Sequence, residues 1–276
     1  RDKRELELGK EHPLVAEAIS GIGGAYSMMG RDGEARPYYE QALAMAGHTV
    51  GTGTVIYARY AMLLGIATQV TDLQRAHGYF QSALEVFTRV VPESAPEAVA
   101  HLNLSMVSLE LADYPATERH VRRSVALYEK LYGPDHPKVG AVLTVLGTML
   151  TRTERWDEAE QALRRSLDIT ERAMGKDSVS TAYSLAALGD LLVSHGRPRE
   201  ALEYLTRATA IRAVQVDEAR DVAPGTILHG RALMALGRRK EALQVVRASR
   251  ARIAASPEVG ADVLARLDAW ITSPQP

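Results

Sequence analysis

The chain has 276 residues, a net charge of −1 and no cysteine. Its near-neutral charge gives no electrostatic case for nucleic acid or an anionic membrane, and the lack of cysteine excludes disulfides and thiolate metal sites. Hydrophobic residues make up 46% of the chain but aromatic residues only 5%, a composition typical of helices that pack through Ala and Leu.

The first eleven residues are predicted to be the tail of a helix from an upstream repeat. Residues 6–13 resemble residues 130–137, where one helix is expected to end and the next to begin. We therefore expect the chain to be the C-terminal arm of a larger protein, and its excess of arginine over lysine points to a bacterial source.

Small residues recur every 41 or 42 positions from residue 12 to residue 254, which indicates an internal repeat. One column of small residues is Ala35, Ala76, Thr117, Ala159, Ala201 and Ala242. A second column, seven residues later, is Ala42, Ala83, Ser124, Ser166, Ala208 and Ser249. A third column lies twelve residues before the first and consists of Gly23, Ser105, Gly147, Gly189 and Gly230. The second repeat has Leu64 at this third position and Gly65 beside it, which predicts a turn one residue shorter.

Six repeats follow one another along the chain, at residues 12–51, 52–93, 94–135, 136–176, 177–218 and 219–254. Each has two stretches with apolar residues at helical spacing, separated by a turn. In the first repeat, we expect helices over residues 13–29 and from about residue 34 to residue 47. Residues 256–271 predict one further amphipathic helix that caps the array, followed by a frayed tail over residues 272–276. The fold class expected is all-α.

Several motifs in the fourth repeat resemble the tetratricopeptide repeat of the 42-residue kinesin-light-chain type. These motifs are Leu146-Gly147, Glu-Arg-Trp-Asp-Glu-Ala at 154–159, Leu-Arg-Arg-Ser-Leu at 163–167, and the linker Gly-Pro-Asp-His-Pro at 133–137. The resemblance covers about residues 9–254. It implies a right-handed α-solenoid of about six helix pairs, with a concave groove lined by the first helix of each pair that binds peptides or protein segments.

The resemblance also implies which side chains line the groove. These are Glu17, Ser20, Met28, Met62, Gln69, Leu102, Asn103, Met106, Glu110, Thr144, Thr148, Arg152, Tyr183, Asp190 and Arg231. Paired asparagines hold the ligand backbone in kinesin-light-chain repeats, and only Asn103 occurs at such a position here. A clamp of the kinesin kind is therefore not expected.

Methionine is prominent among the groove positions, at Met28, Met62, Met106 and Met234. One interpretation is that the groove takes an apolar, largely uncharged helix or loop, because methionine adapts to variable apolar partners. The other is that these methionines belong to the cores of their own repeats. An error of one residue in register turns a helical face by about 100°, so both interpretations stay open.

Basic residues gather near the C-terminus, between residues 231 and 252. Besides Arg231 they include Arg238, Arg239, Lys240, Arg247 and Arg250. A solvated outer helix explains such a run, and a docking patch for an acidic partner is the alternative. Clustered aromatic residues that would stack on bases are missing, which argues against single-stranded nucleic acid.

No catalytic, phosphate-binding or metal-ligating motif is recognisable, so neither an enzyme nor a cofactor is predicted for this segment. The function expected is that of a non-catalytic interaction and scaffold module in the cytoplasm. Its partner would be a protein or peptide, with no nucleic acid and no membrane. The alternatives are a peptide-sensing regulatory domain of a bacterial Ser/Thr kinase or ATPase, and a self-association module.

Overall fold

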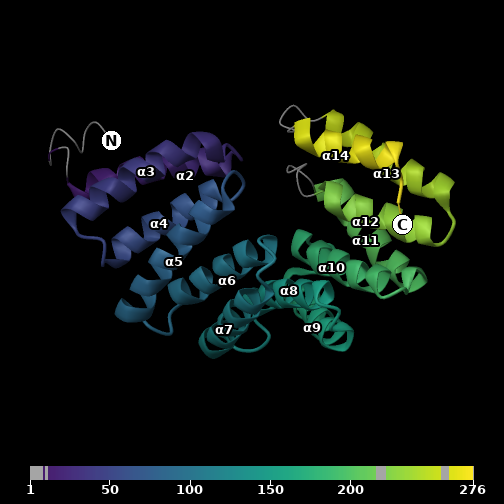
Figure 1. The fold of residues 1–276 in the computed structure, drawn as a ribbon, viewed down its shortest axis with the longest axis horizontal. Coiled ribbons are helices and arrows are strands. Elements are labelled where there is room, and N and C mark those ends of the chain that lie inside the picture. The colour runs from purple at the N-terminus through teal and green to yellow at the C-terminus, as the bar shows by residue number, and fades with distance from the viewer. Residues whose placement is uncertain (1–8, 10–11, 216–221, 256–260, 276) are drawn as a thin grey trace. The chain divides into compact units, whose positions relative to one another are not determined.

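The chain forms helices joined by short turns, as a computed structural model of residues 9, 12–215, 222–255 and 261–275 shows (Figure 1). No β-strand occurs in these described residues. The first helices of the pairs, called A helices below, are α2 (Pro13–Met28), α4 (Val55–Thr68), α6 (Ala95–Glu110), α8 (Pro137–Arg152), α10 (Val179–Ser194) and α12 (Val222–Ala235). The second helices, called B helices, are α3 (Asp32–Thr49), α5 (Leu73–Val90), α7 (Tyr114–Tyr132), α9 (Trp156–Met174), α11 (Pro198–Gln215) and α13 (Arg239–Ala254). The predicted all-α class is confirmed.

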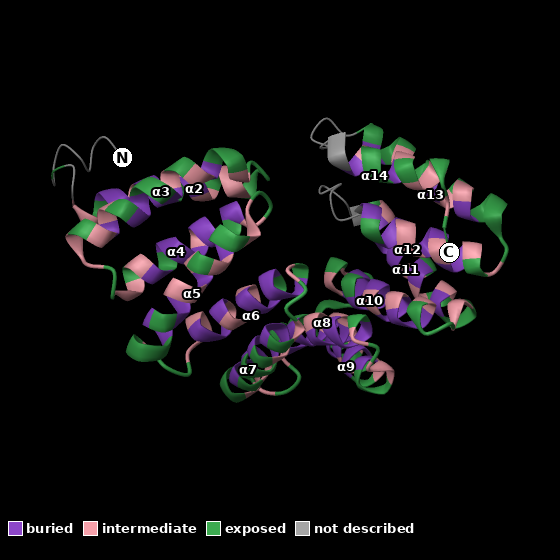
Figure 2. Ribbon diagram, in the orientation of Figure 1, coloured by how far each residue is buried: buried purple, intermediate pink, exposed green. Residues whose placement is uncertain are grey.

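The chain divides into two compact units, residues 1–133 (unit 1) and residues 134–276 (unit 2). Unit 1 contains α2 to α7 and unit 2 contains α8 to α14. Within each unit, an A helix packs against the B helix of its own repeat, and that B helix packs against the next A helix. Each unit thus repeats one packing arrangement three times, and a face of the A helices and a face of the B helices remain in contact with solvent (Figure 2).

Two histidines mark the starts of A helices. The Nδ1 atom of His12 accepts a hydrogen bond from the backbone N–H of Leu14, and His136 accepts one in the same way from Lys138, both at 3.2 Å. Proline follows each histidine, at a position where a helix needs no backbone donor. These two histidines therefore act as helix caps.

Glycines of the third small column allow the two helices of a pair to approach closely. A Cβ atom on Gly147 would lie 2.4 Å from Cγ of Leu163, and a Cβ atom on Gly189 would lie 2.4 Å from Cγ of Leu205. Both leucines are fully buried. The column of small residues thus has the packing cause that the sequence suggests.

The second repeat reaches the same packing with one residue fewer. A Cβ atom on Gly65 would lie 2.5 Å from Cε1 of Phe80, so Gly65 occupies the place that Gly147 has in the fourth repeat. Phe80 follows Gly65 by fifteen residues, whereas Leu163 follows Gly147 by sixteen. The prediction of a shorter turn is nevertheless wrong, because residues 69–72 join α4 to α5 whereas only residues 153–155 join α8 to α9. The missing residue is lost from the end of α4, and every surface position on α4 moves by one residue.

We expect Gly65→Ala to lower the free energy of unfolding by about 1–3 kcal/mol, because its methyl group would overlap the buried ring of Phe80. Gly78→Ala is the matched control, since Gly78 is exposed on α5 and a Cβ atom there meets nothing within 4 Å. The control should stabilise the chain by about 0.5–1 kcal/mol through helix propensity alone. Urea unfolding of both variants tests the register, and a stabilising Gly65→Ala would contradict it.

A further helix, α14 (Ala261–Thr272), covers the last pair. Val263 and Leu267 are buried against Val246 and Ile253 of α13, and Trp270 packs over Gly230 of α12. A helix that buries one face on the last repeat is what a capping helix requires. Residues 256–260, where the cap was predicted to begin, lie outside the described residues.

Candidate protein-binding surfaces

The predicted groove residues on α2 separate into exposed and buried ones. Glu17 and Met28 are exposed, and Met28 is 92% exposed near the end of the helix. Ser20 is buried. Of the three, only Glu17 and Met28 offer a side chain to a partner.

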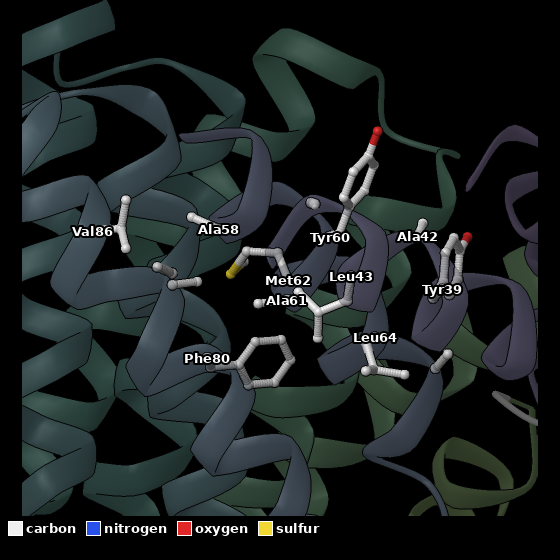
Figure 3. Packing of buried hydrophobic residues seen from close by; sticks show 14 of the residues in the cluster. Tyr39, Ala42, Leu43, Ala58, Tyr60, Ala61, Met62, Leu64, Phe80 and Val86 are labelled. Atoms are coloured by element: carbon white, nitrogen blue, oxygen red, sulfur yellow. The ribbon is translucent and has the colours of Figure 1, made fainter. Parts of the chain in front are cut away.

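Met62 of α4 is a core residue, so the expectation that it lines a binding surface is wrong for this side chain. It lies among Leu43, Ala61 and Phe80 in the unit 1 core (Figure 3) and is 7% exposed. Gln69, the other groove residue predicted here, is the half-buried C-terminal cap of α4. The cause is the missing residue between Gly65 and Phe80, which places the predicted groove positions of this repeat one residue too early.

The exposed face of α4 is instead mainly apolar. Ile56 and Ile66 are exposed on α4 and Val70 is exposed in the turn that follows it, and their spacing puts them on one side. The exposed Arg59 lies on this side too and is its one charged residue. Met28 of α2 occupies the position that corresponds to Val70, and Met106 of α6, which is 42% exposed, corresponds to Ile66. We call these five apolar residues the unit 1 apolar surface; the isoleucines and the valine could have been found in the sequence by aligning Gly65 with Gly147.

Helix α6 adds polar groups beside this surface. The Nδ2 atom of Asn103 is buried and donates no hydrogen bond within the described part of the chain. Leu102 is half-buried beside it, and Glu110 is exposed at the end of the helix. The predicted residues of α6 thus comprise an apolar group, a spare amide donor and a carboxylate.

The corresponding face of α8 in unit 2 is polar. The hydroxyl of Thr144 lies 2.7 Å from Ser166 Oγ, and Thr148 donates a hydrogen bond to the carbonyl oxygen of Thr144 at 2.9 Å. Both threonines are therefore engaged within the unit. Arg152 is exposed at the end of α8.

Asp190 of α10 is the central charge of this unit 2 face. Burial raises its carboxyl pKa above the ordinary value, and Arg231 of α12 and Arg152 of α8 partly oppose the rise. Tyr183, on the same helix, is 40% exposed, and the guanidinium of Arg212 lies 4.3 Å from its ring centroid. Where the A helices of unit 1 present apolar side chains, those of unit 2 present two arginines around a carboxylate.

Ion pairs reduce the charge of the predicted basic patch. Arg238 pairs with Glu241, with its closest contact at 2.6 Å. Arg250 donates from Nε and Nη2 to Asp268 of the capping helix, at 2.7 and 2.9 Å. Arg239, Lys240 and Arg247 are exposed on α13. The patch is consequently weaker than its sequence suggests, which favours the solvated outer helix.

The described part of the chain holds neither a cluster of metal-ligating side chains nor a helix that could cross a membrane. No group of three or more His, Asp or Glu side chains there could hold a metal ion. No helix among those described is long and apolar enough to cross a membrane.

Comparison with known proteins identifies the repeat. A family model described as tetratricopeptide repeat matches residues 2–47, 96–172 and 141–213. No curated protein sequence matches the chain.

Solved structures of low sequence identity share the fold. BtubC (BKLC) from P. vanneervenii is 17% identical with a TM-score of 0.63, and the match covers 89% of this chain and 93% of that one. NprR, in complex with its cognate peptide NprX, is 12% identical with a TM-score of 0.70, over 99% of this chain and 78% of that one. A Rap protein complexed with Competence and Sporulation Factor is 12% identical with a TM-score of 0.66, over 91% of this chain and 69% of that one. At these identities the likeness concerns the fold alone.

Proposed function

Since the chain belongs to the tetratricopeptide repeat family, we propose that it is a non-catalytic interaction module whose unit 1 apolar surface binds a protein segment. The observation that carries the proposal is the exposure of apolar side chains on or directly after three successive A helices, at two positions that each recur in two of them: Met28 with Val70, and Ile66 with Met106. Exposed apolar side chains gathered on one face are typical of protein interaction sites, because their burial against a partner removes apolar area from water.

The chemistry of the surface defines the partner segment. Ile56, Ile66 and Val70 would receive its apolar side chains, and Met28 and Met106 would adapt to their shape. The buried amide donor of Asn103 would hydrogen-bond to a carbonyl oxygen of the bound backbone once its side chain turns toward the surface. An apolar segment with few charges, in a helix or a loop, satisfies all of these groups.

Peptide sensing is the second candidate, and the structural neighbours favour it. NprR and the Rap protein, which share this fold, were both solved with a bound peptide or factor. On this proposal the module belongs to a cytoplasmic bacterial signalling protein, and a short peptide takes the place of the protein segment. Self-association is the remaining alternative, and the mass of the chain in solution separates it from the other two.

We expect Ile66→Glu and Met106→Glu each to weaken binding by at least about tenfold, because each places a carboxylate in an apolar contact. The probe is a set of peptides selected by the wild-type chain from a displayed library of random 12-residue sequences. Val90→Glu is the matched control, since Val90 is 46% exposed but lies at the end of a B helix of the same unit.

Calorimetric titration of the selected peptides checks this prediction. Binding to the Val90→Glu variant should equal wild-type binding, and the selected sequences should be rich in apolar residues. Failure to select any peptide, or equal affinity for all three variants, would contradict the proposed site.

A further inference from the structure

The third repeat differs from the others in the core between its two helices. It carries three ionisable side chains there, Glu97 and His101 on α6 and His120 on α7. The corresponding core residues are Val15, Ile19 and Tyr38 in the first repeat, Tyr57, Ala61 and Tyr79 in the second, Val139, Leu143 and Ala162 in the fourth, and Thr181, Leu185 and Tyr204 in the fifth. No other of these repeats places a charge or an imidazole at these positions.

The two imidazoles contact each other directly. The Nδ1 atom of His101 lies 2.9 Å from the Nδ1 atom of His120. His120 is 9% exposed and the side chain of His101 is 13% exposed, so little water reaches the pair. Because one nitrogen must donate and the other must accept, the contact requires at least one neutral ring.

The position of Glu97 indicates which ring nitrogen of His101 carries the proton when the ring is neutral. Its Oε1 lies 3.8 Å from Nε2 of His101, which favours a proton on that nitrogen and leaves Nδ1 of His101 as the acceptor for His120. Glu97 also accepts the backbone N–H of Glu93 at 2.6 Å and a hydrogen bond from Arg123 at 3.3 Å. The carboxylate is thus held in place by groups other than the histidine.

The charges around the pair act mainly against a second proton. Arg119 and Arg123 of α7 and His77 of α5 oppose a positive charge on the rings, whereas Glu97 and Asp113 favour one. Burial is the largest influence and lowers the pKa of both histidines, that of His120 to about 4. At neutral pH both rings are therefore uncharged and the contact between α6 and α7 is intact.

We propose that the His101–His120 pair makes the binding surface of α6 sensitive to acid. When both rings carry a proton, each Nδ1 is a donor, so the contact breaks and the two helices separate locally. Asn103 and Met106 follow His101 on the same rigid helix, so they move with it. The inference rests on the proposed function, since these two residues belong to or adjoin the surface that would bind the partner.

The variant His101→Leu/His120→Tyr tests the proposal, because it installs the residues that the fifth repeat has at these positions, Leu185 and Tyr204. Circular dichroism checks that it folds, and His120→Gln serves if it does not. With ¹³C-labelled methionine methyl groups, we expect the Met106 signal of the wild type to shift between about pH 7 and about pH 4.5, while that of Met28 stays in place. In the double variant the Met106 signal should not move.

A second measurement links the protonation of the His101–His120 pair to peptide binding. Peptides selected at neutral pH and free of Asp, Glu and His should bind the wild type at least about tenfold more weakly at about pH 4.5, and the double variant less than about twofold more weakly. An unmoved Met106 signal in the wild type, or an equal shift in both proteins, overturns the inference whether or not a peptide binds. Peptide affinities that do not change with pH also overturn it. Failure to select any peptide contradicts the proposed function instead, and the methyl signals alone then decide the inference.

Discussion

Replacing Phe80 by alanine is expected to lower the free energy of unfolding of unit 1 by about 3–5 kcal/mol. The ring is completely buried and fills the space that Gly65 leaves between α4 and α5. It also lies in the core that contains Leu43 and Met62 (Figure 3). Truncation leaves a cavity, because the neighbouring side chains are fixed to their helices and cannot fill it. The loss of stability therefore includes the cost of this cavity as well as the lost free energy of transferring the ring from water into the core.

Val90→Ala provides the control for this variant, since Val90 lies on the same helix but is exposed at its end. Its expected effect is within about 0.5 kcal/mol. Urea unfolding of the full chain, followed by circular dichroism, measures both. A Phe80→Ala loss as small as that of Val90→Ala would mean that the ring does not fill the helix interface.

The repeated packing is the part of the fold that the sequence predicts best. Gly147 and Gly189 recur because a Cβ atom at either position would overlap a buried leucine, so this requirement is local and the same in each repeat. The one-residue offset of the second repeat is also readable from Gly65, since a Cβ atom there would overlap the ring of Phe80. Packing constraints of this kind act between two neighbouring helices, so the residues that satisfy them recur at a regular spacing in the sequence.

The binding surface is predicted less well, because it depends on register. Met62 was predicted as a groove residue, with a core position as the alternative, and it is buried. The one-residue offset of the second repeat makes Ile66 and Val70 the exposed residues. A helix rotates by about 100° per residue, so one deletion exchanges an exposed face for a buried one. Surface residues have no packing requirement of their own that would reveal the shift.

The histidine pair could not be found from sequence spacing. His101 and His120 are nineteen residues apart on different helices, and nothing in the spacing shows that their rings meet. The signal that could have indicated them is the comparison between repeats. At these two positions the fifth repeat has Leu185 and Tyr204, so two histidines in the third repeat depart together from an apolar pair.

Acid should destabilise unit 1 through this pair, by about 2 kcal/mol at about pH 5 and by about 3 kcal/mol at about pH 4 and below. The pKa of His120 falls from the ordinary 6.5 to about 4 in the folded chain, mainly through burial and then through His101. Between these two values the unfolded chain binds a proton that the folded chain does not. Stability is therefore complete above about pH 6.5 and is lost as the pH falls toward 4. The lowered pKa of His101 adds a loss of the same sign.

The measurement is the urea midpoint as a function of pH for the wild type and the His101→Leu/His120→Tyr variant. Carboxylates whose pKa is lowered by an arginine or lysine partner, such as Glu93 and Asp268, lose their stabilising charge at lower pH in both proteins. The difference between the two proteins thus isolates the pair. Parallel curves between about pH 6.5 and about pH 4.5 would show that the folded chain accepts the protons without cost, and the imidazoles would then have to lie in water and not between α6 and α7.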